Sequence, residues 1–265
     1  MVTITIDGKQ ISVDENLSIL EAAQEADVKI PTLCYLKDVN EVGACKMCVV
    51  EVEGSRHLVT SCNTKVKEGM VVNTHSERVV NSRKQVLNML LANHDIRCFS
   101  CSKSGDCRLQ DEYGITKSCY PGSAAKFEAK KENPFLTYYP ELCINCQRCV
   151  STCNKVSCNG TLHNSKIGTR TLIDAPFGPD WKETDCESCG NCAAVCPTGA
   201  LVAKNRKKYQ VGKVKKVLTT CPHCATGCQY YLVVKDNEIV DVEPANGPSN
   251  KGLLCVKGRF GSFHF

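Results

Sequence analysis

Cysteine is the residue type through which this sequence can do chemistry: 21 of its 265 residues are cysteine. Two stretches, CINCQRCVSTC and CESCGNCAAVC, repeat the spacing C-x2-C-x2-C-x3-C. This spacing supplies thiolate ligands for two cubane iron–sulfur clusters, and the fourth cysteine of each run binds the cluster of the other run. The sequence therefore predicts two 4Fe–4S sites, formed by Cys143, Cys146, Cys149 and Cys196, and by Cys186, Cys189, Cys192 and Cys153.

Three further groups of potential metal ligands have four members each. Their spacings are C-x10-C-x2-C-x13-C, H-x3-C-x2-C-x5-C and C-x2-C-x3-C-x26-C. In each group a C-x2-C pair is completed by ligands elsewhere in the chain, a pattern typical of a metal site. The three groups are Cys34, Cys45, Cys48 and Cys62; His94, Cys98, Cys101 and Cys107; and Cys221, Cys224, Cys228 and Cys255.

The composition favours metal binding over disulfide formation. The opening MVTITIDGKQ has no basic region followed by an apolar stretch, so no secretory signal is expected. No apolar run approaches the ~18 residues of a membrane span, so no transmembrane segment is expected. We therefore expect a cytoplasmic protein, in whose reducing surroundings clustered cysteines bind metal more often than they pair.

The first segment shows the elements that would position its four cysteines. In VTITIDGKQISV, alternating apolar residues flank Asp7-Gly8, a β-hairpin signal. Ser18 and Glu21 have the spacing of a capping box at the start of a helix, SILEAAQEA. The stretch MCVVEVEGSRHLVTSC predicts two more strands that turn at Gly54. Strands and a helix within 80 residues indicate an α+β arrangement.

Other elements are predicted further along. An apolar stripe through SERVVNSRKQVLNMLLANH indicates a helix that ends at His94; the stripe comprises Val79, Val80, Leu87, Leu90 and Leu91. The stretch 119–140 is rich in small, charged and helix-breaking residues and is expected to be a linker. Alternation in YYLVVKDNEIVDVEP indicates strands after Cys228. The second ferredoxin-type run is followed by Pro197, whereas the first has Asn154 at that position.

The segment with PTLCY, GACKMC and TSC resembles the β-grasp ferredoxin domain at the start of complex I's large iron–sulfur subunit and of iron-only hydrogenases. The resemblance implies a 2Fe–2S cluster on this first cysteine group, with a zinc site as the alternative. The stretch NHDIRCFSCSKSGDCRLQ is similar to the next part of the same family. There the resemblance implies that His94 is the fourth ligand of a 4Fe–4S cluster, which three cysteines alone would leave one ligand short.

The last segment, CPHCATGC followed by LLCVKG, resembles the N-terminal 4Fe–4S domain of molybdopterin oxidoreductases, notably formate dehydrogenases. Lys257 matches that family's lysine between cluster and pterin, and is expected to lie at the cofactor-binding side of the cluster. His223, inside CPHC, is expected to be a neighbour of the cluster and not a ligand.

The resemblance covers nearly the whole chain and implies four regions. They are a 2Fe–2S β-grasp domain (1–78), a helical His/Cys3 4Fe–4S segment (79–119), a two-cubane ferredoxin domain (135–205) and a small β-rich 4Fe–4S domain (214–265). The implied cofactors are one 2Fe–2S and four 4Fe–4S clusters. The implied function is an electron relay in a multi-subunit NAD(P)-linked hydrogenase. Its partners would be a flavin/NAD(P)-binding subunit and a catalytic hydrogenase subunit, with soluble ferredoxin as a further candidate.

Two alternatives stay open. The chain is also consistent with the relay portion of a formate dehydrogenase whose pterin domains lie elsewhere, and, in a different class, with a zinc-bound structural adaptor. No G-x-G-x-x-G after a strand and no G-x-x-x-x-G-K-[ST] is present, so no flavin, NAD or pterin site is predicted on this chain. The formal charge is +5, but the basic residues are scattered apart from the run 204–216, so nucleic acid is not an expected partner.

Cys119 and Cys158 remain outside these groups. They are expected to be buried thiols that act as small apolar residues. Cys158 is also an alternative to Cys153 as a ligand, although the spacing favours Cys153.

Overall fold

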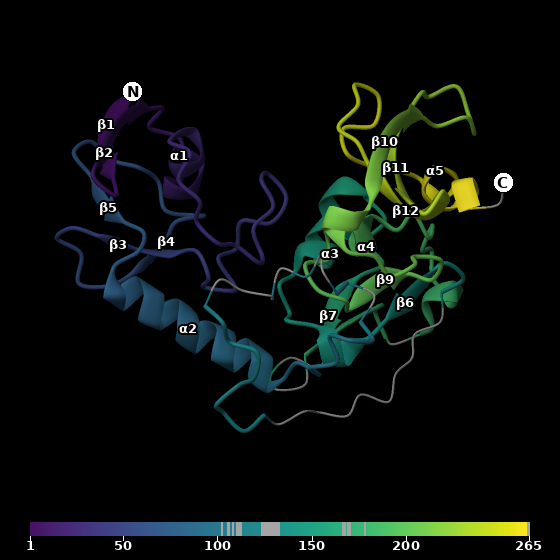
Figure 1. Ribbon diagram of the computed structural model, residues 1–265, viewed down its shortest axis with the longest axis horizontal. Helices are drawn as coiled ribbons and strands as arrows, with labels where there is room; N and C mark the ends of the chain where they lie inside the picture. The colour runs from purple at the N-terminus through teal and green to yellow at the C-terminus, as the bar shows by residue number, and fades with distance from the viewer. Residues whose placement is uncertain are drawn as a thin grey trace. The chain divides into compact units, whose positions relative to one another are not determined.

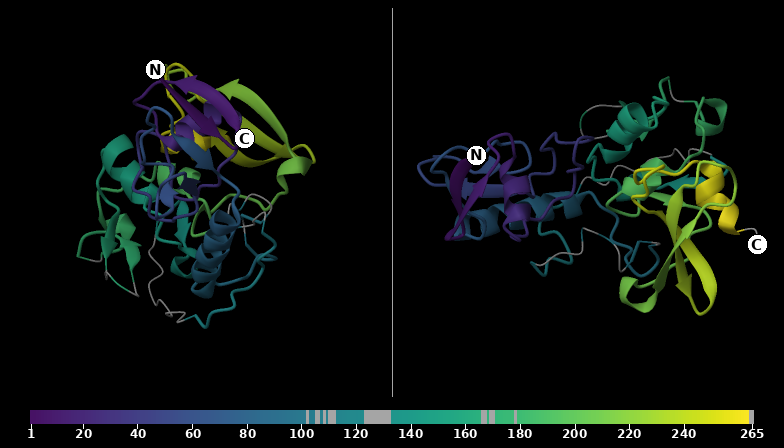
Figure 2. Two further views of the ribbon diagram at one scale, coloured as in Figure 1. Left: turned by 90° about the vertical axis from the view of Figure 1, so that its left-hand side faces the viewer. Right: turned by 90° about the horizontal axis from the view of Figure 1, so that it is seen from above.

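The computed structural model describes residues 1–101, 103, 104, 107, 109, 113–122, 133–165, 168, 171–177 and 179–263. The chain forms two compact units, Met1–Asn93 with Leu109–Ser123, and His94–Arg108 with Ala124–Phe265. Their elements are labelled in Figure 1 and seen from two further sides in Figure 2. Residues 123–132 of the linker expected at 119–140 lie outside the described residues.

The first unit is built on a five-stranded mixed sheet with the order β2-β1-β5-β3-β4. Strands β1 and β2 form the hairpin expected at Asp7-Gly8, with Ile6 paired to Lys9 and positive φ angles of 47° and 83° at the two turn residues. Strand β5 pairs parallel to β1 and antiparallel to β3. The strands are β1 (Val2–Ile6), β2 (Lys9–Val13), β3 (Val49–Val52), β4 (Val59–Thr60) and β5 (Val71–Asn73).

Helix α1 (Ile19–Glu25) covers this sheet and begins at the expected capping box. The Ser18 hydroxyl accepts from the Glu21 amide at 3.2 Å, and the Glu21 carboxylate accepts from the Ser18 amide at 2.9 Å. The helix buries its apolar residues in one core with the sheet, where Ile4, Ile6, Ile19 and Val72 are almost completely buried. Two of the cysteines, Cys48 and Cys62, belong to the same core.

Helix α2 (Glu77–Ala92) follows β5 and buries Val79, Leu87 and Leu91 of the expected stripe. It also buries Arg83, which the apolar pattern did not indicate. The Arg83 guanidinium donates to the Val49 carbonyl at 2.8 Å and to the Tyr113 hydroxyl at 3.2 Å. Arg83 therefore ties α2 both to the central sheet and to the returning segment around Tyr113.

The second unit begins with a small β-sheet core in which β6 (Leu136–Tyr138) pairs with β9 (Leu201–Ala203). Between them lie two short helical turns, each preceded by a cysteine loop. The first turn, α3 (Arg148–Ser151), continues as a wider helical turn, η2 (Thr152–Val156), whereas the second, α4 (Asn191–Val195), stops before Pro197. The difference follows from the residue types. Proline cannot donate within a helix, but Asn154 can continue it, and its side chain donates to the Val150 carbonyl at 2.9 Å.

The remaining elements of this region surround the two turns. Strands β7 and β8 form an antiparallel pair, and Trp181 of a short 3₁₀ turn packs in the common core beside Tyr138. These elements are η1 (Pro140–Leu142), β7 (His163–Ser165), β8 (Leu172–Asp174) and η3 (Trp181–Glu183).

The end of the second unit is a three-stranded antiparallel sheet, seen in green and yellow in Figure 2. Strands β11 and β12 turn at Asp236 and Asn237, both with positive φ, as the alternation after Cys228 indicated. Helix α5 follows the last cysteine and packs against β12. The elements are η4 (Val211–Lys213), β10 (Lys215–Thr220), β11 (Gln229–Lys235), β12 (Glu238–Pro244), α5 (Val256–Phe260) and η5 (Gly261–Phe263).

The mixed helix and sheet content agrees with the expected α+β class. The expectation for the two remaining cysteines was wrong, because Cys119 and Cys158 are both exposed. Each lies on an irregular segment outside the helices and strands. Among the described residues, no helix combines the length and the apolarity that a membrane crossing requires.

The capping box leads to a prediction on local stability. Ser18→Ala removes the acceptor of the Glu21 amide, and such a loss costs about 1 kcal/mol. We expect about fivefold faster native-state hydrogen exchange for the amides of α1. Lys84→Ala, a change at an exposed site within α2, is the control and should leave these rates unchanged. Equal rates in Ser18→Ala and the native chain would contradict a stabilising role for the cap.

Candidate metal centres

The first cysteine group lies buried beside the sheet of the first unit. Cys34, Cys45, Cys48 and Cys62 are each at most 8% exposed. The Sγ atoms of Cys48 and Cys62 are 3.3 Å apart, and the Cys45 amide donates to the Cys34 Sγ at 3.5 Å. The structure therefore brings this whole group together.

Hydrogen bonding polarises these thiols in pairs. The Cys34 side chain lowers the pKa of Cys45 to about 6, and the Cys62 side chain lowers the pKa of Cys48 to about 7. In return, the same bonds and burial raise the pKa of Cys34 and Cys62. The thiolate is the metal-binding form, so a lowered pKa suits Cys45 and Cys48 to bind metal.

The loop that carries this group depends on unusual backbone angles. Gly43 and Lys46, which flank Cys45, have φ of 61° and 57°. A Cβ atom at Gly43 would come within 2.9 Å of the Asn63 side chain, and the positive φ also favours glycine there. The Asn40 side chain donates to the Cys34 carbonyl at 2.7 Å and holds the other side of the loop.

The two repeated runs of the second unit form two separate cavities. One is lined by Cys143, Cys146, Cys149 and Cys196, together with Tyr138 and Pro197. The other is lined by Cys153, Cys186, Cys189 and Cys192, together with Trp181 and Ser157. The structure thus groups the fourth cysteine of each run with the first three cysteines of the other run.

The loops of the two runs have matching backbones. Asn145 and Gln147 of the first run have φ of 51° and 68°, and Ser188 and Gly190 at the corresponding positions of the second have 53° and 73°. These turns direct successive cysteines toward the same cavity. Burial raises the pKa of Cys143 to about 11 and of Cys146 to about 12, so these thiols need a positive partner such as a metal to ionise at neutral pH.

Polar groups surround the sulfur atoms of both runs. The Asn145 amide donates to the Cys143 Sγ at 3.4 Å, and the Asn133 side chain donates to the Cys186 Sγ at 3.7 Å. The Ser157 hydroxyl lies 3.7 Å from the Cys189 Sγ. Hydrogen bonds to cluster sulfurs are one of the ways a protein sets a reduction potential.

The His94 group lies in the second unit. His94 hydrogen-bonds the Leu142 backbone, while its Nδ1 atom is buried and has no hydrogen-bond partner. The Cys101 Sγ also lies near Leu142, because both side chains face Gly199. A Cβ atom at Gly199 would come within 2.5 Å of the Cys101 Sγ and 3.4 Å of a Leu142 methyl carbon. Cys98 is exposed, and Cys101 and Cys107 are half-buried.

The state of His94 suits a metal ligand. Burial lowers the pKa of His94, which keeps the imidazole neutral. A neutral imidazole with one ring nitrogen hydrogen-bonded to a backbone carbonyl presents the other nitrogen to a metal. The buried Nδ1 atom has no hydrogen-bond partner and is therefore the candidate ligand atom.

The last cysteine group lies between β10, β11 and α5. The Cys221 amide donates to the Cys228 carbonyl at 2.7 Å. Burial is the largest effect that raises the pKa of Cys228, and the nearby thiols of Cys221, Cys224 and Cys255 raise this pKa further. Cys255 begins helix α5 as its N-cap residue. All four members of this group are therefore neighbours.

Two flanking residues were also singled out from the sequence. Lys257 is exposed on α5. Hydrogen bonds with Thr226 are the main cause of the lowered pKa of Cys224, and the nearby positive charge of Lys257 lowers this pKa further. His223 packs against Gly261, where a Cβ atom would overlap its ring. This contact places His223 beside the cysteines, on the side of η5.

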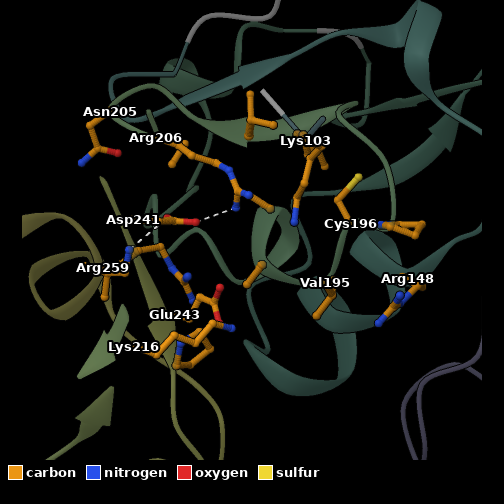
Figure 3. A pocket seen from close by; sticks show the side chains of 18 residues that line it. Lys103, Arg148, Val195, Cys196, Asn205, Arg206, Lys216, Asp241, Glu243 and Arg259 are labelled. Carbon is orange, nitrogen blue, oxygen red and sulfur yellow. Dashed lines mark hydrogen bonds and ion pairs between the residues drawn. The ribbon is translucent and has the colours of Figure 1, made fainter. Parts of the chain in front are cut away.

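A cavity in the second unit contains charged residues that the sequence patterns did not identify (Figure 3). Arg206 pairs with Asp241 at 2.5 Å, and Lys216 pairs with Glu243 at 2.6 Å. The lining also includes three further basic residues and one proposed ligand; these are Lys103, Arg148, Arg259 and Cys196. Buried basic residues give no periodic signal in the sequence, so only folding reveals that they converge here.

Among the described residues there is no group of three or more His, Cys, Asp or Glu that could hold a metal ion. An iron–sulfur cluster differs from a single ion, because each iron of a cubane takes one thiolate and the cluster body lies between them. The two cysteine-lined cavities, the mutually close thiols and the unpartnered His94 nitrogen suit such clusters.

Models of four known domain families match successive parts of the chain. Residues 1–77 match a 2Fe-2S iron–sulfur cluster binding domain, and 83–118 match the NADH-ubiquinone oxidoreductase-G iron–sulfur binding region. Residues 133–202 match the ferredoxin-like domain of NADH-quinone oxidoreductase subunit 3, and 214–265 match the Fe4S4 domain of molybdopterin oxidoreductases.

Curated relatives are much longer than this chain. It is 38% identical over 268 residues to an NADPH-Fe(3+) oxidoreductase alpha subunit from Geobacter sulfurreducens, covering 98% of this chain and 31% of the relative. It is 44% identical over 210 residues to the NADP-reducing hydrogenase subunit HndD from Solidesulfovibrio fructosivorans, covering 76% of this chain and 36% of that one. The chain thus spans about a third of the length of these relatives.

A solved structure is similar over most of its own chain. It belongs to an NAD+-reducing [NiFe]-hydrogenase in the H2-reduced state, with a TM-score of 0.71 and 30% identity, and covers 77% of this chain and 87% of that one. Other relatives are named as an NADH-quinone oxidoreductase chain and as putative formate dehydrogenases. The chain belongs to the family of iron–sulfur relay chains that includes the N-terminal region of complex I's large iron–sulfur subunit and similar chains of hydrogenases and formate dehydrogenases.

Proposed function

We propose that this chain is the electron relay of a multi-subunit NAD(P)-linked hydrogenase. It would pass single electrons between a flavin/NAD(P)-binding subunit and a catalytic hydrogenase subunit. The observation that carries the proposal is the crossed grouping of eight cysteines around two cavities, because this is the arrangement of a two-cubane electron-transfer domain.

The proposed cofactors are one 2Fe–2S cluster and four 4Fe–4S clusters. The four buried cysteines of the first unit would hold the 2Fe–2S cluster, and the two repeated runs would hold two cubanes. His94 with three cysteines would hold the third cubane, and the group ending at Cys255 the fourth. Such clusters transfer one electron at a time, so hydride chemistry falls to a flavin on a partner.

The hydrogenase assignment is supported by two similarities. The solved relative is a chain of an NAD+-reducing hydrogenase, and the NADP-reducing hydrogenase subunit shares 44% identity over the aligned part. Soluble ferredoxin is a further proposed exchange partner. The abundance of thiols suits the reducing cytoplasm, where we propose the complex works.

A second candidate function is the relay portion of a formate dehydrogenase. It is favoured by the match of residues 214–265 to the molybdopterin oxidoreductase domain and by Lys257, which lies beside Cys224 on the face of the last cysteine group. In this alternative Lys257 would face a pterin held by other domains. The zinc adaptor is the alternative without redox function.

Metal analysis of the native complex tests these assignments. The complex is purified without oxygen through a tag on this chain. Abundant iron with near-stoichiometric nickel is expected, whereas molybdenum or tungsten would establish the formate dehydrogenase alternative. Iron as the sole transition metal would indicate an iron-only hydrogenase or a transhydrogenase as the complex. A colourless chain with zinc and no iron would overturn the relay function altogether.

The crossed grouping predicts which cluster depends on Cys153. Cys153→Ala should remove the cubane of Cys186, Cys189 and Cys192 and spare the cubane of its own run, because the Cys153 side chain lines the other cavity. Iron content and electron paramagnetic resonance of the full chain measure this, with signals assigned through Cys146→Ala and Cys189→Ala. Cys158→Ala is the matched control, since Cys158 is exposed five residues away. Loss of the cluster in the control and not in Cys153→Ala would reverse the assignment.

Ligation by His94 predicts a change in potential. His94→Cys would replace a neutral imidazole by an anionic thiolate, which disfavours the added electron. At a fixed solution potential the reduced-to-oxidised ratio of this cluster should fall about tenfold or more, which is ~59 mV for one electron. The nitrogen hyperfine coupling of its resonance should disappear. His163→Gln, at an exposed histidine, should change neither quantity; an unchanged nitrogen coupling in His94→Cys would show that His94 is not a ligand.

A further inference from the structure

Arg259 joins the last cysteine group to one of the two repeated runs. It lies on α5, four residues after Cys255, and is only 5% exposed. Its Nε donates to the Cys189 carbonyl at 2.9 Å, and its Nη2 donates to the Asn191 side-chain oxygen at 3.0 Å. The guanidinium thus binds directly to the loop that carries Cys189 and Cys192.

A second hydrogen bond joins the same two loops. The Leu254 amide donates to the Asn191 side-chain oxygen at 3.3 Å. Leu254 precedes Cys255 and Asn191 precedes Cys192, so one bond connects residues adjacent to ligands of two different proposed cubanes. Phe260 stacks on Phe135 with ring centroids 4.8 Å apart and extends the contact. The last cysteine group is therefore attached to the cavity of the second run.

The residues of the second loop allow this attachment. Gly190 has φ of 73°, and a Cβ atom there would overlap the Arg259 Cδ. The corresponding position of the first loop is Gln147, which carries a side chain, and the next position is Arg148 in place of Asn191. A second guanidinium facing Arg148 would be repelled, and the acceptor that Asn191 supplies in the second loop would be missing. The sequence difference between the two loops therefore selects which of them Arg259 can bind.

The position of Arg259 also has an electrostatic consequence. Burial lowers the pKa of Arg259, and the nearby Cys189, Cys192, Asp241 and Cys255 act in the opposite direction. Arginine keeps its charge even so, because its intrinsic pKa is very high. A fixed positive charge thus lies among ligands of two clusters, and a cluster held by four thiolates is an anion that becomes more negative on reduction.

We propose that Arg259 is a positioning residue. It holds the cubane of Cys153, Cys186, Cys189 and Cys192 next to the cubane at Cys255, so that these two clusters exchange electrons. The positive charge of Arg259 favours the reduced state of the cubane that includes Cys189. This rests on the proposed function, since it requires the clusters to be present. In the step, one electron leaves one cubane, which is oxidised, and enters the other, which is reduced. No atom is transferred, and the Arg259 proton stays in place.

Potentiometric titration of the full chain, followed by electron paramagnetic resonance, tests this role. In Arg259→Gln, at a fixed solution potential, the reduced-to-oxidised ratio of the Cys189 cubane should fall about tenfold, which is ~59 mV for one electron. The ratio of the Cys146 cubane should change much less. Arg259→Lys keeps the positive charge, so the reduced-to-oxidised ratio of the Cys189 cubane should return to near its native value. The cluster signals are assigned through Cys189→Ala, Cys146→Ala and Cys224→Ala.

The same samples test the pairing of the clusters. When the clusters are reduced, spin–spin coupling should be seen between the Cys224 cubane and the Cys189 cubane. No such coupling should be seen between the Cys224 cubane and the Cys146 cubane. The matched control is Lys216→Gln, which removes one positive charge from the same cavity but from a lysine paired with Glu243. It should leave both the ratio and the coupling near those of the native chain.

Each outcome bears on a distinct claim. Unchanged ratios in Arg259→Gln with full iron content, or coupling of the Cys224 cubane to the Cys146 cubane, would overturn the inference and leave the relay function intact. Loss of the Cys189 cubane in both Arg259 variants would make Arg259 a purely structural residue and overturn its redox role. A native chain without any clusters would overturn the proposed function itself, and the inference with it.

Discussion

The whole structure depends on one constraint: thiol groups from distant parts of the chain must meet around a common centre. Short loops in left-handed backbone conformations accomplish this, as at Asn145, Gln147, Ser188 and Gly190. The secondary structure is correspondingly brief, and several strands have only three residues. Such small sheets bury little apolar surface, so the bound clusters are expected to contribute much of the folding free energy, as metals do in other small domains.

Buried positive charge is the second feature that shapes the chain. Several of the basic residues that contribute to the formal charge of +5 lie inside the fold. Arg83 links α2 to β3, and Arg148 and Arg259 line the cavity of the second unit. A buried charge is costly unless it has a partner of opposite sign. For Arg259, which lies near Cys189, Cys192 and Cys255, an anionic cluster would provide that partner.

The two repeated runs have similar backbones but different surroundings. Asn154 allows the first helical turn to continue as η2, whereas Pro197 ends the second. Where the first loop has Gln147, the second loop has Gly190, and the missing side chain leaves room for Arg259. The internal repeat thus keeps two cysteine-lined cavities with similar loop backbones and gives them unequal neighbours.

Several features followed from the sequence alone, because they depend on local spacing. The Asp7-Gly8 hairpin and the Ser18–Glu21 cap are each set by residues within one turn. Only the tertiary structure showed that Cys119 and Cys158 are exposed, that Arg83 is buried and that Arg259 reaches Cys189 across 70 residues. These features depend on which distant surfaces pack together, and no local pattern of residue types records that.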